Sequence, residues 1–279
     1  MKQTLQEDRA WNDVTTRALR HGGGRGEAVI RARASGVLAG GPAARAAFLI
    51  RDRSLAVKTL VSEGSGVRPG QSILRVRGSL GSILSAERTA LNLLSRLSGI
   101  ATITRRFVRA VHGTGVPIYD TRKTTPGLRA LEKYAVKTGG GQNHRMDLSS
   151  AVLLKDNHLR AMKRSGDSPR ECLQRLRKSR FKNKVVEMEA QNLREVWEAL
   201  SAGADVILLD NLETPLLKKA MQLIQAAQET RTSLSPKAEV SGGITLSNVK
   251  TIASFKPDRI SVGMITHSAP AMNFNLDLL

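Results

Sequence analysis

The spacing of apolar residues divides the chain into two regions with different patterns. In residues 28–77, short apolar segments alternate with turns that contain glycine, which is typical of β-strands. In residues 85–111, apolar positions recur every three or four residues, which predicts helical structure with a break at Gly99. We therefore expect a small open sheet followed by helices. The expected strands of this region are residues 28–32, 37–38, 55–58 and 73–76.

A different pattern begins after Gly113. A short apolar strand ends in polar residues or glycine and is followed by a segment whose apolar residues have helical spacing. This unit recurs six times. Parallel strands joined by crossover helices explain it most simply, so we predict an α/β barrel or a barrel-like domain. The expected strands are residues 116–119, 151–154, 185–188, 206–209, 238–240 and 260–262, and the later helices are residues 193–201, 215–228 and 246–255.

The charge of the chain points to an anionic ligand. The sequence holds 44 Lys and Arg against 24 Asp and Glu, a formal net charge of +20, which attracts polyanions or small phosphorylated and carboxylated molecules. Residues 160–184 are the most basic stretch, and we interpret them as a solvated helix face, with a polyanion-docking patch as the alternative. Two Trp, two Tyr and five Phe offer few stacking platforms for single-stranded nucleic acid.

The remaining composition favours a cytoplasmic protein. No apolar run approaches the roughly 20 residues of a membrane-spanning helix, and the first fifteen residues have no signal-peptide core. The single cysteine, Cys172, excludes an internal disulfide and any CxxC metal site.

Charged and polar side chains gather where the predicted barrel strands end. In (β/α) barrels the pocket lies at the carboxyl ends of the strands. Alternation along a strand also puts Glu187 with Glu189, and Glu239 with Ser241, on a common face toward the barrel mouth. The residues at the strand ends are Arg122, Lys123, Lys155, Glu189, Asp210 and Ser241-Gly242-Gly243.

The early strands carry a concentration of positive charge in Arg122, Lys123, His144, Arg145 and Lys155. Arginine offers a planar fork to a carboxylate or phosphate, and lysine acts as a compact charge. We expect these four permanent cations and the imidazole to be tolerable together only if a multiply charged anion binds among them.

A glycine turn late in the predicted barrel has the composition of a phosphate cradle. Ser241-Gly242-Gly243-Ile244 precedes the helical run from Leu246, so bare backbone N–H groups are expected near a helix N-terminus. Gly263 follows the next strand, in the late-strand position where barrels commonly hold phosphate.

A zinc site is not expected, because His144 and His158 do not have the HExxH spacing or another zinc-ligand spacing. Glu189 and Asp210 instead suit Mg²⁺ or ribose hydroxyls, since magnesium prefers one or two carboxylates together with substrate phosphate oxygens.

Nearly the whole chain resembles the quinolinate phosphoribosyltransferase family. Seven stretches occur in the family's order. They are residues 86–92 (Ala-Glu-Arg-Thr-Ala-Leu-Asn), 120–129 (Asp-Thr-Arg-Lys-Thr-Thr-Pro-Gly-Leu-Arg), 139–145 (Gly-Gly-Gly-Gln-Asn-His-Arg), 154–158 (Leu-Lys-Asp-Asn-His), 208–211 (Leu-Leu-Asp-Asn), 241–244 (Ser-Gly-Gly-Ile) and 261–263 (Ser-Val-Gly).

The resemblance implies an N-terminal open-faced α/β sandwich domain, residues 1–97, and an incomplete (β/α) barrel, residues 98–279. It also implies a homodimer, or a higher multiple, in which Arg88 reaches the neighbouring subunit's site. By position, Lys123, Lys155, Glu189 and Asp210 are the expected catalytic residues, and Glu189 and Asp210 the expected Mg²⁺ ligands. The full expected substrate-binding set is Arg88, Thr121, Arg122, Lys123, His144, Arg145, Lys155, Glu189, Asp210, Ser241, Gly242, Gly243 and Gly263.

The implied reaction joins quinolinate to phosphoribosyl pyrophosphate and yields nicotinate mononucleotide, carbon dioxide and pyrophosphate, a step of NAD biosynthesis. Two alternatives are a paralogue of the same fold with another acceptor, such as the molybdenum-operon type, and a basic nucleic-acid-binding protein without this activity. The chain departs from the family's pattern in three places. Ala10-Trp11-Asn12-Asp13 stands for the usual Gly-x-Gly-Asp, Arg96 replaces the usual histidine, and after the Asn-His-Arg motif Asp147 and Ser150 replace the usual Gly and Asp. We expect Arg96 to border the neighbour's pocket and to affect which acid is accepted.

Overall fold

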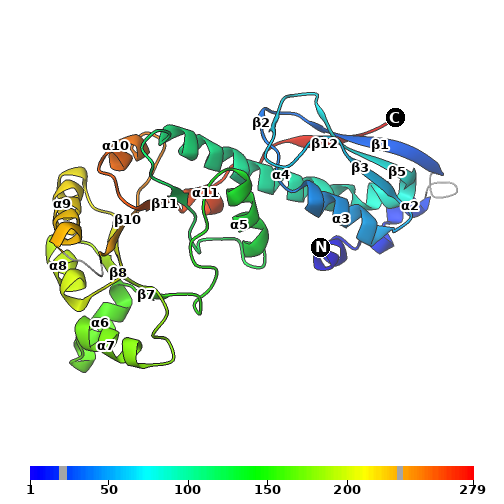
Figure 1. Cartoon of the computed structure of the whole chain (residues 1–279). Helices are drawn as coiled ribbons and strands as arrows, with labels where there is room; N and C mark the ends of the chain where they lie inside the picture. The colour runs from blue at the N-terminus through cyan, green and yellow to red at the C-terminus, as the bar shows by residue number, and fades with distance from the viewer. Residues whose placement is uncertain (19–23, 231–234) are drawn as a thin grey trace. The chain divides into compact units, whose positions relative to one another are not determined.

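The computed structural model describes residues 1–18, 24–230 and 235–279, which form two compact units (Figure 1). Unit 1 consists of Met1–Arg105, Thr125–Gly140 and Ser268–Leu279, and unit 2 of Arg106–Thr124 and Gly141–His267. The two units therefore alternate along the sequence.

Unit 1 contains an antiparallel sheet of four strands in the order β12-β1-β5-β3. The open sheet predicted from the sequence is present, and the sequence did not reveal that a C-terminal strand, β12, forms its edge. The strands are β1 (Arg25–Ala32), β3 (Ala56–Thr59), β5 (Ser72–Ser79) and β12 (Phe274–Leu278), and a separate antiparallel pair is formed by β2 (Gly36–Val37) and β4 (Gly66–Val67).

Helices cover this sheet and share its core. The side chains of Phe48 from α3, Ile73 and Leu74 from β5, and Ile83 and Leu94 from α4 are fully buried in one apolar cluster. Burial of such large side chains is the main source of stability for a sheet with one apolar face. The helices of this part are α1 (Lys2–Glu7), η1 (Ala10–Asn12), α2 (Val14–Ala18), α3 (Gly41–Arg51), α4 (Leu80–Ala110) and α5 (Arg129–Thr138).

The expected break at Gly99 is wrong, because α4 is one continuous helix of 31 residues. Gly99 has a packing role instead: a Cβ atom at this position would lie 2.1 Å from the carbonyl oxygen of Pro270. Only glycine permits this close crossing of the C-terminal segment over the helix. The helix α3 was also missed, since Gly40-Gly41-Pro42 appeared to be a simple turn; Gly40 instead adopts a left-handed conformation just before the helix.

Unit 2 contains a parallel sheet of six strands in the order β6-β11-β10-β9-β8-β7. All six strands predicted from the sequence are present, within a few residues of the expected bounds. Among the described residues, no pairing joins the edge strands β6 and β7, so the sheet stays open, as expected of an incomplete barrel. The strands are β6 (Ile118–Tyr119), β7 (Val152–Leu154), β8 (Val186–Ala190), β9 (Val206–Asp210), β10 (Lys237–Ser241) and β11 (Arg259–Ser261).

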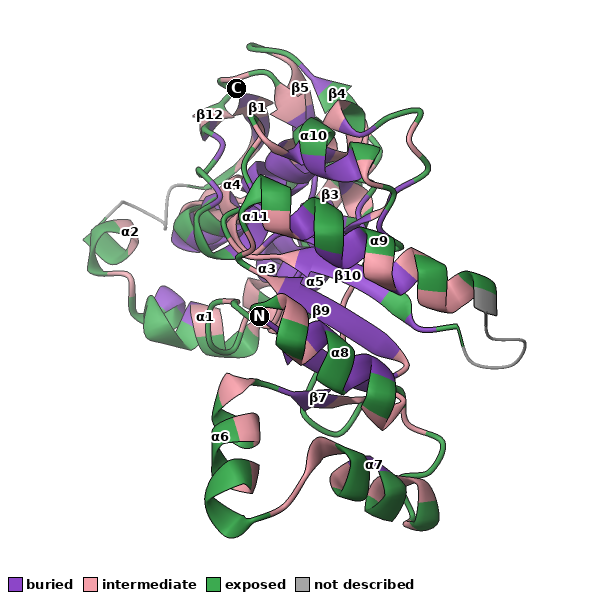
Figure 2. Cartoon of the chain, turned by 90° about the vertical axis from the view of Figure 1, so that its left-hand side faces the viewer, coloured by how far each residue is buried: buried purple, intermediate pink, exposed green. Residues whose placement is uncertain are grey.

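Amphipathic helices follow these strands. In α8 (Leu193–Ala202), Val196, Ala199 and Leu200 are buried while Trp197 is exposed, and Figure 2 shows buried central strands beside helices with exposed outer faces. The helix predicted over residues 246–255 begins only at Val249. The other helices of unit 2 are α6 (Asp156–Ser165), α7 (Pro169–Lys178), α9 (Thr214–Thr230), α10 (Val249–Ser254) and α11 (Met264–His267).

The basic stretch of residues 160–184 forms α6, α7 and the segment after them, and parts of it are paired with acidic residues. Arg175 contacts Asp167, and Arg177 contacts Asp205. In residues 1–18, 24–230 and 235–279, none of the helices combines the length and apolar character that crossing a membrane requires.

Candidate active site

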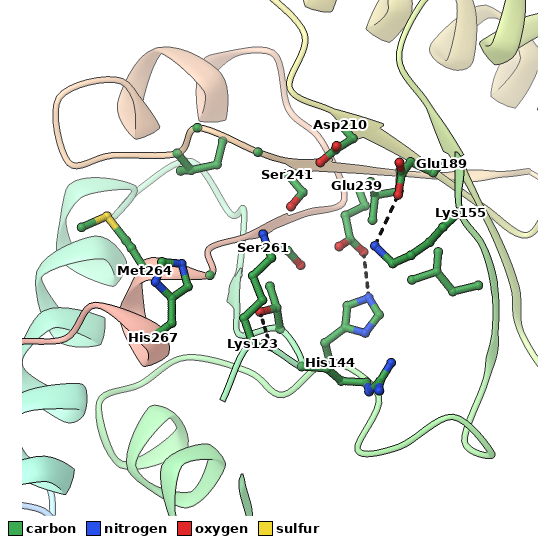
Figure 3. Close-up of a pocket in the computed structure, with 18 of the residues that line it drawn as sticks. Lys123, His144, Lys155, Glu189, Asp210, Glu239, Ser241, Ser261, Met264 and His267 are labelled. Carbon is green, nitrogen blue, oxygen red and sulfur yellow. Dashed lines mark hydrogen bonds and ion pairs between the residues drawn. The ribbon is translucent and has the colours of Figure 1, made fainter. Parts of the chain in front are cut away.

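A cavity of about 760 Å³ lies in unit 2, where the parallel strands end (Figure 3). Because all six strands run in one direction, their carboxyl ends meet at the same edge of the sheet. Arg88 is the one predicted site residue outside the lining; it is exposed on α4 in unit 1. The lining includes the other twelve, which are Thr121, Arg122, Lys123, His144, Arg145, Lys155, Glu189, Asp210, Ser241, Gly242, Gly243 and Gly263.

Lys155 and Glu189 form an ion pair at the rim of this cavity. Lys155 follows β7 and Glu189 lies near the end of the neighbouring strand β8, and Lys155 Nζ is 3.3 Å from Glu189 Oε2. Gln191 Nε2 donates to the other carboxylate oxygen at 3.3 Å. Glu189 is thus held by two donors while the lysine side chain remains half exposed to a ligand.

The segment after β6 presents Arg122 and Lys123 to the cavity. The backbone N–H of Lys123 donates to Thr121 Oγ1 at 3.0 Å, and Thr266 Oγ1 donates to the Lys123 carbonyl at 2.7 Å. These bonds fix the backbone that carries both cations. Within the described residues, Arg122 Nε is buried and has no hydrogen-bond partner. A buried N–H without an acceptor is costly, so this position favours an acceptor supplied by a ligand.

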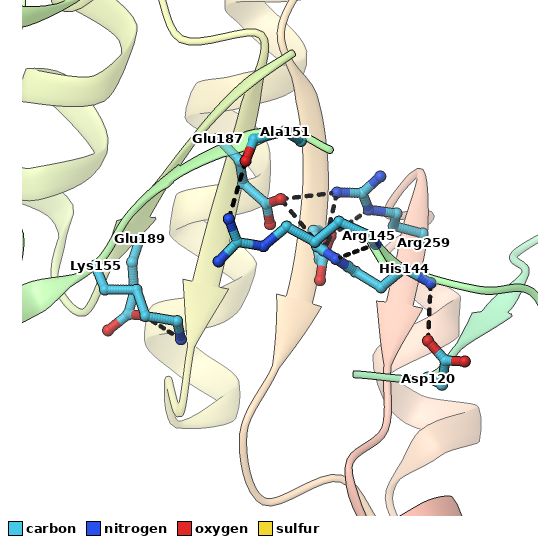
Figure 4. A network of polar contacts seen from close by, with 9 residues as sticks. Asp120, His144, Arg145, Ala151, Lys155, Glu187, Glu189 and Arg259 are labelled. Atoms are coloured by element: carbon cyan, nitrogen blue, oxygen red, sulfur yellow. Dashed lines mark hydrogen bonds and ion pairs between the residues drawn. The ribbon is translucent and has the colours of Figure 1, made fainter. Parts of the chain in front are cut away.

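A buried group of four charged side chains, named here the His144 cluster, lies against the cavity (Figure 4). It consists of His144, Glu187, Glu239 and Arg259. His144 Nε2 lies 3.2 Å from Glu187 Oε2 and 3.4 Å from Glu239 Oε2. Arg259 Nη2 lies 3.1 Å from Glu187 Oε2, and Arg259 Nε contacts Glu239 Oε2. Each carboxylate therefore contacts both cations.

The cluster shifts the proton affinities of its members. Burial disfavours charge on His144, but the hydrogen bonds that its Nε2 donates to Glu187 and Glu239 outweigh burial and raise the pKa of His144 to about 9. Burial would also raise the pKa of Glu239, yet the hydrogen bond with His144 and the charge of Arg259 lower that pKa to about 2. At Glu187, burial dominates and raises the carboxyl pKa. The two carboxylates thus favour a proton on His144 Nε2, while Nδ1 accepts from the backbone N–H of Arg145 at 2.8 Å.

Built-in carboxylates balance part of the positive charge of the site. Glu189 balances Lys155, and Glu187 acts on Arg145 as well as on His144. Burial is the main cause that lowers the pKa of Arg145, and repulsion from Arg122 lowers that pKa further. The negative charge of Glu187 acts in the opposite direction and raises it. The expectation that Glu187 and Glu189 would point together into the cavity is wrong, because only Glu189 lines it.

The Ser241–Gly243 turn closes another side of the cavity. Gly242 and Gly243 have φ angles of +82° and +62°, and a Cβ at Gly242 would lie 2.6 Å from the backbone nitrogen of Asn211. Glycine is therefore required for the turn to pass this close to the end of β9. The expected contribution of a helix N-terminus is reduced, since α10 starts at Val249, well after the turn.

Several residues of the cavity were missed from the sequence. Gln191 and His267 line the cavity and were not selected, because single polar residues near strand ends are common. Arg259 begins β11 and lies outside the lining, and no motif marked its contacts with Glu187 and Glu239. The two departures Asp147 and Ser150 contact each other in an exposed turn, where Ser150 Oγ donates to Asp147 Oδ1 at 2.8 Å.

Two groups of side chains could be considered for a metal ion. His144, Glu187 and Glu239 present ligand atoms within 4.8 Å of one another. The guanidinium of Arg259 already contacts both carboxylates, so these side chains form an ion-pair cluster rather than a metal site. Glu189 and Asp210 end adjacent strands and line the same cavity. Their hard carboxylate oxygens fit Mg²⁺ when phosphate oxygens complete the coordination.

Comparison with known families shows which family the chain belongs to. A model of the quinolinate phosphoribosyl transferase C-terminal domain matches residues 100–277, and a model of the N-terminal domain of the same enzyme matches residues 13–98. The chain belongs to the quinolinate phosphoribosyl transferase family. This membership confirms the resemblance drawn from the sequence motifs.

Individual members of the family agree with this assignment. The chain is 38% identical over 281 residues to a Synechocystis protein named "Probable nicotinate-nucleotide pyrophosphorylase [carboxylating]", covering 100% of this chain and 91% of that protein. It is 38% identical to the human nicotinate-nucleotide pyrophosphorylase [carboxylating], over 94% of this chain and 85% of the human one.

Solved structures extend the similarity to the fold. NadC from Streptococcus pyogenes superposes with a TM-score of 0.87 at 36% identity, covering 100% of this chain and 95% of that one. Nicotinate-nucleotide pyrophosphorylase from Ehrlichia chaffeensis gives a TM-score of 0.89 at 35% identity, covering 100% and 97%. The predicted α/β fold class is thereby confirmed for this family member.

Proposed function

We propose that the chain transfers the phosphoribosyl group of phosphoribosyl pyrophosphate to quinolinate with loss of carbon dioxide, as a pentosyltransferase of NAD biosynthesis. The observation that carries the proposal is a cavity that brings together Arg122, Lys123, His144, Arg145 and Lys155. Family membership supports the same activity.

The cations suit a substrate with two carboxylates. Arg122 and Arg145 can each offer a guanidinium to a carboxylate, and the unpartnered Arg122 Nε supplies a donor in the required place. Lys155 adds positive charge in the same cavity, and His144 lies there too. We assign quinolinate to this side of the cavity, with Lys123 and Lys155 as the catalytic cations.

The glycine turns of the cavity suit the sugar phosphate. Gly242, Gly243 and Gly263 leave backbone close to the open space, as binding of the 5′-phosphate requires. Thr121 and Ser241 add hydroxyl groups, and Glu189 and Asp210 offer carboxylates that can accept hydrogen bonds from ribose hydroxyls.

Glu189 and Asp210 are also the residues that we propose hold Mg²⁺ with the pyrophosphate. When bound, magnesium supplies positive charge that neutralises the departing pyrophosphate. The two carboxylates themselves favour the positive charge that develops at ribose C1 as its bond to pyrophosphate breaks.

The chemistry then requires two bond exchanges. The pyridine nitrogen forms a bond to ribose C1 while the bond from C1 to the pyrophosphate oxygen breaks. The bond from the ring C2 to its carboxylate breaks next, carbon dioxide leaves, and the electron pair at C2 takes up a proton. Holding both substrates in one cavity makes the first encounter effectively intramolecular, and Arg145 and Lys155 are placed to stabilise the charge that decarboxylation develops.

We further propose that the protein works as a homodimer, or a multiple of one, with Arg88 of one subunit completing the site of another. Arg88 is exposed on α4 and is absent from the cavity lining within its own chain. Analytical ultracentrifugation, combined with mixing of Arg88→Ala and Lys155→Ala proteins, tests this proposal. Recovery of activity on mixing supports a shared site, and inactive mixed dimers contradict it.

The test of the function uses purified protein, Mg²⁺ and phosphoribosyl pyrophosphate with either quinolinate or nicotinate. We expect pyrophosphate and mononucleotide from quinolinate only. Product from nicotinate alone would favour an acceptor other than quinolinate, and release in neither mixture would contradict the proposal.

A further inference from the structure

The edge of the parallel sheet at which the strands of unit 2 begin carries positive charge that lies outside the cavity. The cavity is at the carboxyl ends of the strands, and a strand of five residues spans about 15 Å, so the two edges of the sheet form separate surfaces. We name the cations near the end of α7 and near the starts of β8, β10 and β11 the basic edge. It consists of Lys178, Arg180, Lys182, Lys184, Lys237 and Lys256.

Contacts and strand register place these cations along one line. Arg177, in the last turn of α7, contacts Asp205, which directly precedes β9, and Lys184 lies shortly before β8. Lys237 begins β10 and pairs in register with Val206, the first residue of β9. The strands β8, β9, β10 and β11 are neighbours in the sheet. Because neighbouring strands lie about 4.8 Å apart, the basic edge extends over about 15 Å.

The charge of the basic edge is not balanced by ion pairs. Its side chains are exposed, apart from the partly buried Lys184, and none of them has an ion pair within the described residues. The acids beside them are used by the backbone: Asp205 accepts from the N–H of Val186 at 2.7 Å, and Asp258 accepts from the N–H of Ala238 at 2.7 Å. Like charges gathered along one edge attract a polyanion.

A row of cations fits a phosphodiester backbone better than a lipid surface. Duplex DNA carries one negative charge for about every 1.7 Å of its axis, so about 15 Å of duplex presents several phosphates. The guanidinium of Arg180 lies over the ring of Phe181, 4.9 Å from its centroid. Phe181 and Val185 are 41% and 49% exposed, and two such side chains do not form the apolar face that inserts into a bilayer.

We propose that the basic edge binds the phosphate backbone of nucleic acid, without sequence preference and independently of the catalytic cavity. The interaction is electrostatic, because the chain has few aromatic side chains for stacking on bases. Each cation that contacts a phosphate releases a condensed counterion, so the affinity falls steeply as salt rises. This activity goes beyond phosphoribosyl transfer and accounts for part of the net charge of +20.

The test measures binding of a fluorescein-labelled DNA duplex of about 20 base pairs by anisotropy, between about 50 and 200 mM KCl. For wild type we expect the logarithm of the association constant to fall with the logarithm of the salt concentration with a slope of about −4.5, the value for about five neutralised phosphates. Combining Lys178→Gln, Arg180→Gln and Lys182→Gln should change the slope to about −2 and weaken binding at least tenfold at the lowest salt.

Two control proteins separate a local surface from net charge. Arg33→Gln, Lys58→Gln and Arg68→Gln, combined in one protein, remove the same charge from exposed positions of unit 1 and should leave binding as in wild type. Lys155→Met removes a cation from the cavity and should also bind DNA as wild type does. Equal weakening in both triple variants, or loss of binding in Lys155→Met, would overturn the proposal.

A second measurement uses the wild-type protein, in case the glutamine variant folds poorly. Acetylation of lysines is followed by mass spectrometry with and without the duplex. We expect the duplex to protect Lys178, Lys182 and Lys237 and to leave Lys58 unprotected; equal labelling in both samples would contradict the proposed surface.

Other ligands and the enzyme assay complete the test. An RNA duplex of the same sequence shows which nucleic acid binds more tightly, and binding of neither duplex refutes the proposal. Binding to phosphatidylserine vesicles without binding to a duplex would replace it with a lipid surface. Pyrophosphate release by the folded glutamine variant should equal that of wild type, and a loss of turnover would contradict independence from the cavity. Since DNA binding is measured without substrates, failure of the proposed function leaves this result intact.

Discussion

Lys155 Nζ lies 3.3 Å from Glu189 Oε2 across the carboxyl ends of the adjacent parallel strands β7 and β8. The lysine side chain is 48% exposed and the glutamate side chain 6% exposed. Glu189 is therefore the fixed member of the pair, and Lys155 is the member that can turn toward an anionic ligand. This arrangement places an acceptor for ribose hydroxyls beside a cation for carboxylate or pyrophosphate.

Replacing Lys155 with methionine should lower kcat/KM about 10² to 10³-fold, the cost of losing one charge-stabilising group in an active site. The methionine keeps most of the apolar stem, so the fold is expected to persist. Steady-state pyrophosphate release measures the effect. Lys163→Met, on the exposed face of α6, makes the same change of net charge and should leave the rate unaltered; equal losses in both proteins would contradict a local role.

Replacing Arg122 with alanine should raise KM for quinolinate at least tenfold, because the substrate loses a guanidinium whose Nε has no other acceptor among the described residues. Arg122→Lys keeps the charge but not the planar fork and should recover only part of the affinity. Calorimetric binding of quinolinate gives the comparison. Arg164→Ala, an exposed position on α6, is the control for charge alone, and normal turnover by Arg122→Ala would count against the assigned role.

Replacing Gly242 with alanine should raise KM for phosphoribosyl pyrophosphate and destabilise the protein by about 1–3 kcal/mol. The added Cβ would lie 2.6 Å from the nitrogen of Asn211, in a residue that already has φ +82°. Gly113→Ala provides the matched control, since Gly113 has φ +84° and a Cβ added there would meet no atom within 4 Å. Urea unfolding and substrate titration of both variants separate the clash from the backbone strain, and identical behaviour would refute the steric argument.

Replacing Arg96 with alanine should lower the free energy of unfolding by about 3 kcal/mol, as expected when one partner of a buried pair is removed. Arg96 Nη2 lies 2.8 Å from Oε1 of the fully buried Glu132, which also accepts from the backbone N–H of Thr125. Arg194→Ala breaks a comparable pair on an exposed helix face and should cost less than about 1 kcal/mol. A loss no greater than that of Arg194→Ala would contradict this stabilising role.

The sequence was sufficient for the parallel sheet because its signals were local. Each strand of unit 2 is a short apolar run followed by a polar residue or glycine, and helices with clear periodicity separate the later strands. The residues that follow such strands share one edge of the sheet, which explains why twelve predicted residues line one cavity.

The features that the sequence did not reveal depend on contacts between distant segments. Gly99 resembled a helix breaker, and only the carbonyl of Pro270, near the far end of the chain, shows why glycine is needed there. The pairing of Glu187 with His144 and Arg259 likewise joins three separate elements. Alternation along β8 assigned Glu187 to a face but could not show which charges would meet it.

The most direct test of the central claim follows the 2-carboxyl carbon of quinolinate. With labelled substrate, Mg²⁺ and phosphoribosyl pyrophosphate, we predict that the wild-type protein releases one carbon dioxide for each pyrophosphate and each nicotinate mononucleotide formed. Pyrophosphate released with the label retained in the nucleotide, or no release from quinolinate at all, would contradict the account.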